Sequence, residues 1–148
     1  MFSSISDVTR HLINHLKTNC KTIKTVELFP LALTEFPIEQ PTVSVGLQSA
    51  EINYGEGIYE GTDSSGNTYY GATAGCVYSL KICLSKSRSG LDCYQAFDTV
   101  ADACLGIDEL NIIRMFLGEI YYDRPMSALV LNAGIELTAK LETVTKKG

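Results

Sequence analysis

Two histidines at helical spacing are the first residues of this chain that could do chemistry. His11 and His15 lie four residues apart, and on one face of a helix such a pair can bind zinc. The glutamate that accompanies this pair in zinc hydrolases is absent, and no third ligand is evident. A catalytic triad would also need this helix inside a pocket. We therefore interpret both histidines as solvated helix residues and expect no metal.

A polar stretch from Asn53 to Thr68 combines oxygen ligands with glycines. Asp63, Ser65 and Asn67 partly match a calcium loop, but the terminal glutamate of that motif is missing. The segment GEGIYEG leads into a predicted strand and not a helix, so it lacks the context of a phosphate-binding loop. We predict a flexible loop over 53–68. Two interpretations stay open: a loop that a partner orders, and a solvent-exposed hairpin tip.

The cysteines could supply nucleophiles, metal ligands or disulfides. There are five, at positions 20, 76, 83, 93 and 104, and each lies inside an apolar pattern. The odd number and the absence of a signal-peptide pattern favour reduced, buried thiols. Neither a paired-cysteine zinc spacing nor a nucleophile elbow is present. These missing motifs predict a protein that is not an enzyme.

The composition argues against nucleic-acid-binding and membrane proteins. The net charge of −5, without a basic patch, does not suit a surface that binds phosphates. No run of eighteen apolar residues could span a membrane. Hydrophobic residues make up 45% of the 148 residues, which excludes disorder. No linker divides the chain, so we expect one domain over 1–148.

The candidate residues would be positioned by two helices and about five strands. Apolar stripes predict helices over 4–18 and 91–105, the second with Ser89 as N-cap, Asp92 three residues on, and Gly106 at the C-terminal end. Its buried stripe is predicted to be Phe97, Val100, Ala101 and Cys104. Strands are predicted over 22–29, 42–52, 69–85 and 111–122, and from 129 on. The fold class is α+β, with a mainly antiparallel sheet and the order α-β-β-β-α-β-β.

The last two predicted strands differ in pattern. From Leu129 to Leu141 every second residue is apolar, which predicts one buried face and one wet face. The predicted strand over 111–122 has large apolar side chains on both of its faces. Strict alternation would put Ile112, Arg114, Phe116 and Tyr122 on the same face. Such a strand is either covered on both sides or presents a surface to a partner.

Taken together, the element order resembles the tail terminator (tail completion) proteins of long-tailed bacteriophages, of the lambda type, and related caps of phage-tail-like bacteriocins. The segments that carry the resemblance cover nearly the whole chain: SSISDVTRHLINHLK, VELFP, FPIEQPTVSVGL, YYGATAGCVYSLKICL, GLDCYQAFDTVADACL and IIRMFLGEIYYDRPMSALVLNAGIELTAKL.

The resemblance implies a protein without catalysis or cofactor that forms a hexameric ring on the last ring of a tail tube. The ring would stop tube polymerisation and meet the neck, collar or sheath. Assembly would take place in the host cytoplasm, with no membrane or sequence-specific nucleic acid as partner. We expect the interface to use loop residues and one face of the strand over 111–122: Tyr54, Glu56, Tyr59, Glu60, Asp63, Arg114, Phe116 and Tyr122.

Two other interpretations remain. The chain could be another head–tail joining or tube component, and a tube subunit would polymerise on its own. It could also be a small ligand-binding or enzymatic α+β domain with a pocket between the second helix and the sheet, where a specific small molecule would raise the melting temperature.

Overall fold

The computed structural model describes residues 2–27, 40–54, 60–62, 64, 66 and 68–145. These contain two helices and six strands, listed here in chain order: α1 (Ile5–Asn19), β1 (Lys24–Glu27), β2 (Thr42–Asn53), β3 (Glu60–Thr62), β4 (Thr68–Ser85), α2 (Gly90–Cys104), β5 (Leu110–Asp123) and β6 (Ala128–Thr145). The predicted α+β class is confirmed.

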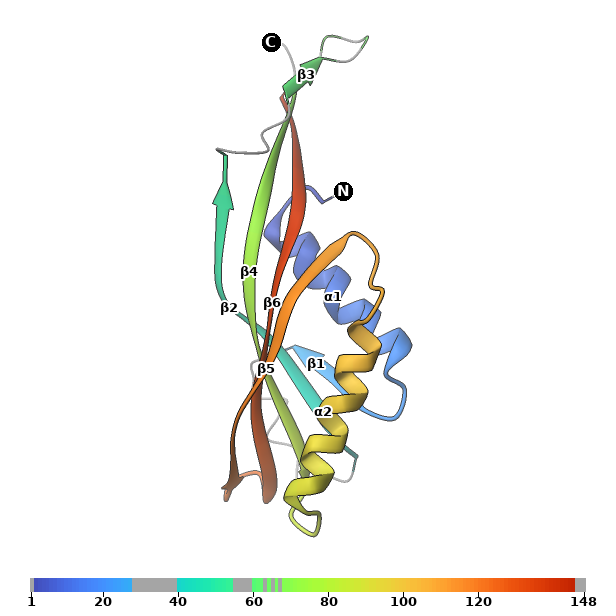
Figure 1. Ribbon diagram of the computed structural model, residues 1–148, viewed down its shortest axis with the longest axis vertical. Helices are drawn as coiled ribbons and strands as arrows, with labels where there is room; N and C mark the ends of the chain where they lie inside the picture. Colours follow the sequence, from blue (N-terminus) through green and yellow to red (C-terminus); the bar gives the residue numbers. More distant parts are fainter. Residues whose placement is uncertain are drawn as a thin grey trace.

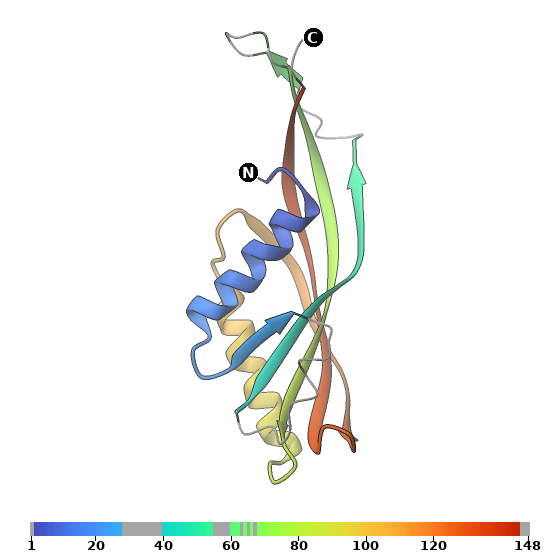
Figure 2. The same ribbon diagram turned by 180° about the vertical axis from the view of Figure 1, so that it is seen from behind.

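The strands form one sheet in the order β1-β2-β4-β6-β5, with β3 paired to the start of β4. All neighbours are antiparallel except β1 and β2, which run parallel. Strand β3 lies within 53–68, where we expected a loop, and much of the remainder of that range lies outside the described residues. Both helices cover the same face of the sheet, and β4 and β6 form a long ribbon through its centre (Figures 1 and 2). We call the helix-covered side the inner face and the other side the outer face.

Capping residues lie at the ends of both helices, and those predicted for α2 are confirmed. Ser4 caps α1 by accepting a hydrogen bond from the backbone N–H of Asp7. Ser89 and Asp92 form a reciprocal capping box at the start of α2. Gly106 follows α2 with a φ of 72°, a left-handed conformation that glycine adopts without a steric penalty.

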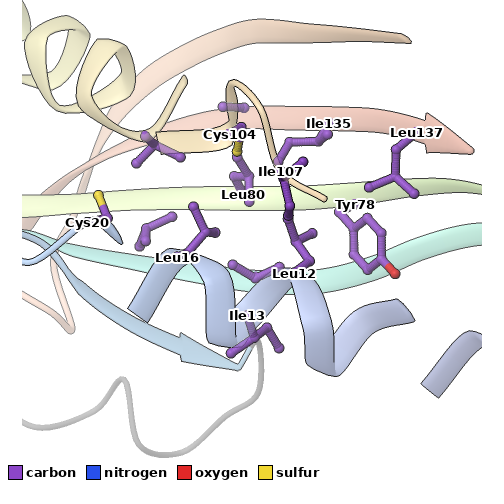
Figure 3. Packing of buried hydrophobic residues seen from close by; sticks show 14 of the residues in the cluster. Leu12, Ile13, Leu16, Cys20, Tyr78, Leu80, Cys104, Ile107, Ile135 and Leu137 are labelled. Atoms are coloured by element: carbon purple, nitrogen blue, oxygen red, sulfur yellow. The ribbon is translucent and has the colours of Figure 1, made fainter. Parts of the chain in front are cut away.

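The core lies between the helices and the inner face (Figure 3). Leu12 and Leu16 of α1 point toward Tyr78 and Leu80 of β4, and Ile135 of β6 lies in the same layer. The period-two pattern of β6 is therefore confirmed on its inner face. The prediction of a solvent-exposed outer face is wrong for part of the sheet, because Val130 of β6 and its partner Cys83 of β4 are fully buried on that face.

The buried stripe of α2 is rotated from the predicted one. Val100 and Cys104 are buried as expected, and Cys93 and Ala96 complete the stripe. Phe97 packs against the core but is only partly buried. The prediction weighted the large ring of Phe97 over the small side chains, whereas small residues let the helix lie close to the sheet.

The predicted faces of β5 are also corrected. The register of β5 against β6 shifts between Ile112 and Arg114 and again between Leu117 and Ile120. Each irregularity breaks the alternation of side chains. Ile112 consequently pairs with Leu137 on the inner face, whereas Arg114 pairs with Glu136 on the outer face. The two residues do not share a face.

Candidate assembly surfaces

The large apolar side chains that the described residues leave exposed fall into two groups at opposite edges of the sheet. One group, the β2 surface, lies along β2 and just beyond it: Leu47, Ile52 and Tyr54. The other, the β5–α2 surface, comprises Leu91, Tyr94, Leu105, Ile113, Leu117 and Tyr122. Ile113 belongs to its outer-face side, where it lines a hollow with Glu51 and Val77, whereas α2 covers the inner face. Exposed apolar groups that cluster in this way mark interaction surfaces more often than scattered ones do.

Each surface adjoins an open strand edge. Strand β5 ends the sheet, so among the described strands none pairs with its outer edge. Strand β1 pairs only with Thr42–Val45 of β2, which leaves Gly46–Asn53 without a described strand on that side. Open edges offer unpaired backbone donors and acceptors to another chain. The two flanks therefore combine apolar side chains with hydrogen-bonding potential.

The inner side of the β2 surface is hollowed. An open groove of about 370 Å³ runs between α1 and β2, and its walls include Ile5, Thr9, Ile13 and Leu47. The helix covers β2 only as far as this groove, so Leu47 and Ile52 remain exposed although they continue the inner-face alternation. Arg10 and Glu27 also line the groove, so its walls carry both apolar and charged side chains.

On the outer face, β5 carries a cluster of stacked side chains. The ring of Phe116 lies over Gly134, where a Cβ atom would overlap the ring. The guanidinium carbon of Arg114 stands 4.8 Å from the centre of that ring, and its Nε donates to Glu136 at 2.6 Å. The ion pair and the stacking hold Arg114 in place at the exposed surface.

Some of the predicted interface residues are described, and they do not form one patch. Arg114 and Phe116 are in contact, but Tyr122 lies near the other end of β5, and Tyr54 follows β2 across the sheet. Glu60 is described only in its backbone, which pairs with Tyr70. Three further predicted residues lie outside the described part of the chain: Glu56, Tyr59 and Asp63.

Sequence reasoning missed part of both surfaces. Leu47 follows the alternation of the core residues Val43 and Val45, and only the position of α1 shows that it is uncovered. Ile52 reaches the same face only through the register shift between Leu47 and Ser49. Leu91, Tyr94 and Leu105 lie outside the buried stripe of α2, which is a signal that the helical pattern did contain.

The two histidines join α1 to the segment around the end of α2. His11 Nε2 lies 2.9 Å from the carbonyl oxygen of Asp108, and His15 Nε2 lies 2.6 Å from that of Ala103. Each ring nitrogen donates its proton to the carbonyl. Both residues are half-buried and hydrogen-bonded, so the interpretation as solvated helix residues is only partly correct. Within the described ranges, no group of three or more His, Cys, Asp or Glu residues could hold a metal ion.

The five cysteines are free and buried. Burial raises the pKa of Cys83 to about 11 and that of Cys104 to about 12, so neither is a thiolate at neutral pH. Burial likewise raises the pKa of Tyr78, whose hydroxyl shares a hydrogen bond of 2.8 Å with Thr9. These groups are protonated core residues and not nucleophiles.

Among the acidic residues of α2, Asp92 has a structural role. Hydrogen bonds from the Ser89 backbone and from Arg88 lower the pKa of Asp92 within the capping box. Asp98 and Asp102 are exposed on α2. Buried side chains fill the space between α2 and the sheet, where the ligand-binding interpretation placed its pocket. No described helix is long and apolar enough to cross a membrane.

A solved structure has a similar fold. It is the sheath/tube terminator of an extracellular contractile injection system, PVC, determined by cryo-EM in the extended state. The TM-score is 0.58 at 13% sequence identity, and the match covers 100% of this chain. The chain spans 60% of the length of that terminator. No model of a known protein family matches the sequence, and no curated protein does.

Proposed function

We propose that this protein is a structural component that caps the head-proximal end of a tail tube as a hexameric ring. The ring ends polymerisation of the tube and provides the surface that the neck or collar binds. The observation that carries the proposal is the likeness in fold, along the entire chain, to a terminator of a contractile injection system. Partners on this proposal are the tube protein and, in a contractile particle, the sheath. The role requires neither catalysis nor a cofactor.

The two assembly surfaces support this role. They lie on opposite flanks of the sheet, so one copy can present its β5–α2 surface to the β2 surface of the next. Such a head-to-tail contact is heterologous, and it closes into a ring when the rotation between copies divides a full turn. A hexamer needs a rotation of about 60° at each contact.

Tube assembly in the presence of this protein tests the proposal. The tube protein of the same particle would be polymerised with and without it, and tube lengths measured by electron microscopy. We expect shorter tubes that carry extra density at one end. Leu47→Glu, which changes an exposed residue of the β2 surface, is the matched variant expected to cap poorly. An unchanged length distribution with bare tube ends would refute the capping role.

A second candidate is a tube or joining subunit that polymerises without closing. The same head-to-tail surfaces favour it, because heterologous contacts that do not close give open filaments. Filaments formed by the purified protein alone would support this candidate. Discrete rings would support the cap.

A further inference from the structure

The open edges of β2 and β5 lie at the same height in the sheet. Strand pairing connects them level by level: Ile52 pairs with Ala74, Ala74 with Ala139, and Ala139 with Leu110. At the other end of these two edges, Gly46 pairs with Ser79, Ser79 pairs with Gly134, and Gly134 pairs with Phe116. Gly46–Ile52 and Leu110–Phe116 therefore occupy the same levels at opposite edges.

The directions of the two strands also fit. Neighbours β2, β4, β6 and β5 are successively antiparallel, so β2 and β5 run in opposite directions. A second copy, related by rotation about an axis along the strands, would place its β2 antiparallel to β5 of the first. The alternation of strand directions would then continue from one copy to the next.

Side chains at equal levels match on the inner face. Leu110, Ile112 and Met115 point to the inner face of β5, since their β6 partners are the inner-face residues Ala139, Leu137 and Ile135. The residues of β2 at these three levels are Ile52, Ala50 and Leu47. All six are apolar, so pairing of the edges would cover the exposed Leu47 and Ile52.

The outer face offers opposite charges. Arg114 lies at the level of Ser49, and Asn111 lies at the level of Glu51. Glu51 is exposed and makes no ion pair within the described residues. Arg114 bonds Glu136 through Nε, which leaves its two terminal nitrogens without a described partner. Glu51 of the next copy would lie diagonally across from Arg114, within reach of long side chains.

We propose that Leu110–Phe116 of one copy pairs antiparallel with Gly46–Ile52 of the next, so that the sheet continues from copy to copy. The pairing deepens the proposed function and rests on it, because the ring requires one repeated contact. Both segments carry one irregularity, at Gln48 in β2 and at Ile113 in β5. The second irregularity of β5 follows at Gly118 and Glu119, just beyond the segment proposed to pair.

Cysteine cross-linking between copies tests the register. Glu51→Cys and Asn111→Cys combined in one chain place thiols at the same level of the two edges, on exposed positions. The five native thiols are buried and do not compete. Under mild oxidation we expect a ladder of covalent dimers, trimers and larger species, because each copy joins two neighbours. Each single variant should remain without a cross-link, because its thiol faces the native Asn111 or Glu51 of the next copy.

A second pair of cysteines serves as the control, and light scattering measures the mass. Together they distinguish a failure of the edge pairing from a failure of the capping role. Glu51→Cys with Lys17→Cys, on the exposed side of α1, should give no ladder. Discrete oligomers by light scattering without a ladder from Glu51→Cys/Asn111→Cys would overturn the edge pairing and leave the ring intact. A ladder from a protein that leaves tube length unchanged would overturn the capping role and keep the pairing. A monomer at every concentration would overturn the pairing as a contact between copies.

A variant of the apolar side gives an independent readout. Leu47→Glu with Ile52→Glu puts charges where the pairing would bury apolar side chains. Because both positions are exposed in the single chain, we expect an unchanged circular dichroism spectrum and at least about tenfold weaker self-association. Thr99→Glu on α2 is the control with a new charge away from both edges. Equal self-association of all these variants would contradict the pairing.

Discussion

At the scale of single residues, the buried cysteines make the free energy of unfolding depend on pH. The thiol of Cys83 has a pKa of about 11, raised from the ordinary 9.0 by burial. Below pH 9 the thiol is protonated in both states. Between pH 9 and 11 only the unfolded chain loses this proton, so the free energy of unfolding falls as the pH rises. For Cys83 the loss is about 2 kcal/mol by pH 11.

Chemical denaturation at pH 8.5 and 11 measures this loss. Tyrosines and lysines titrate in the same range, so the comparison is between the native chain and Cys83→Ala, which lacks the thiol. We expect the variant to lose less stability between the two pH values. Equal losses in both proteins would contradict the assignment. Maleimide should label the native thiols only after unfolding, since all five are buried.

A second prediction concerns the ring that covers Gly134. Gly134→Val introduces a branched side chain where Phe116 already lies, so the ring must move away and lose its contact with Arg114. We expect a cost of about 1–2 kcal/mol in the free energy of unfolding. In a Phe116→Ala background the same substitution should cost much less. Equal costs in the two backgrounds would show that the ring does not occupy this space.

At the scale of elements, β6 contributes the alternating apolar side chains of its inner face to the core. Ile135 is fully buried on its inner face, with Tyr78 of β4 and Met115 of β5 as cross-strand partners. Ile135→Asp would bury an unpaired carboxylate, at a cost of several kcal/mol, and should unfold the domain. Lys140→Asp, on the same strand but exposed, should leave the domain folded. Circular dichroism of both variants is the measurement. A folded Ile135→Asp protein would contradict the observed inner face.

The elements also show what sequence alone could predict. Local signals determined the capping box at Ser89 and the alternation of β6, and both were confirmed. The faces of β5 were not predictable, because the irregularity after Ile112 comes from pairing with β6 and carries no residue signature. Nor did spacing show that His15 reaches the Ala103 carbonyl, 88 residues away.

The same limit applies to the candidate site. Arg114 and Phe116 were predicted as surface residues and do contact each other. Leu47 has the alternation of a core residue, yet it is exposed because α1 does not extend over it. Which strands end the sheet depends on the tertiary pairing of distant segments, so the two open edges could not be identified from sequence.

At the scale of the whole molecule, the position of the two surfaces limits the kinds of assembly. Surfaces on opposite flanks cannot satisfy each other in a two-fold dimer that pairs like with like, because one flank of each copy would stay exposed. On the proposed head-to-tail contact, copies of this chain cover both flanks in a closed ring or an open filament. The molecule is elongated in Figure 1, and the β4–β6 ribbon extends beyond β5 at one end, past the pairing of Leu110 with Ala139.

Light scattering across a range of protein concentrations distinguishes these assemblies. A closed hexamer of the 16.2 kDa chain predicts a plateau at about 97 kDa that further concentration does not raise. An open filament predicts a mass that grows without a plateau, since each added copy leaves a new edge exposed. Leu47→Glu should lower the mass toward that of one chain in either case, because it places a charge in the apolar contact. A native protein with the mass of a single chain at every concentration, and without recruitment to tail tubes, would contradict the ring.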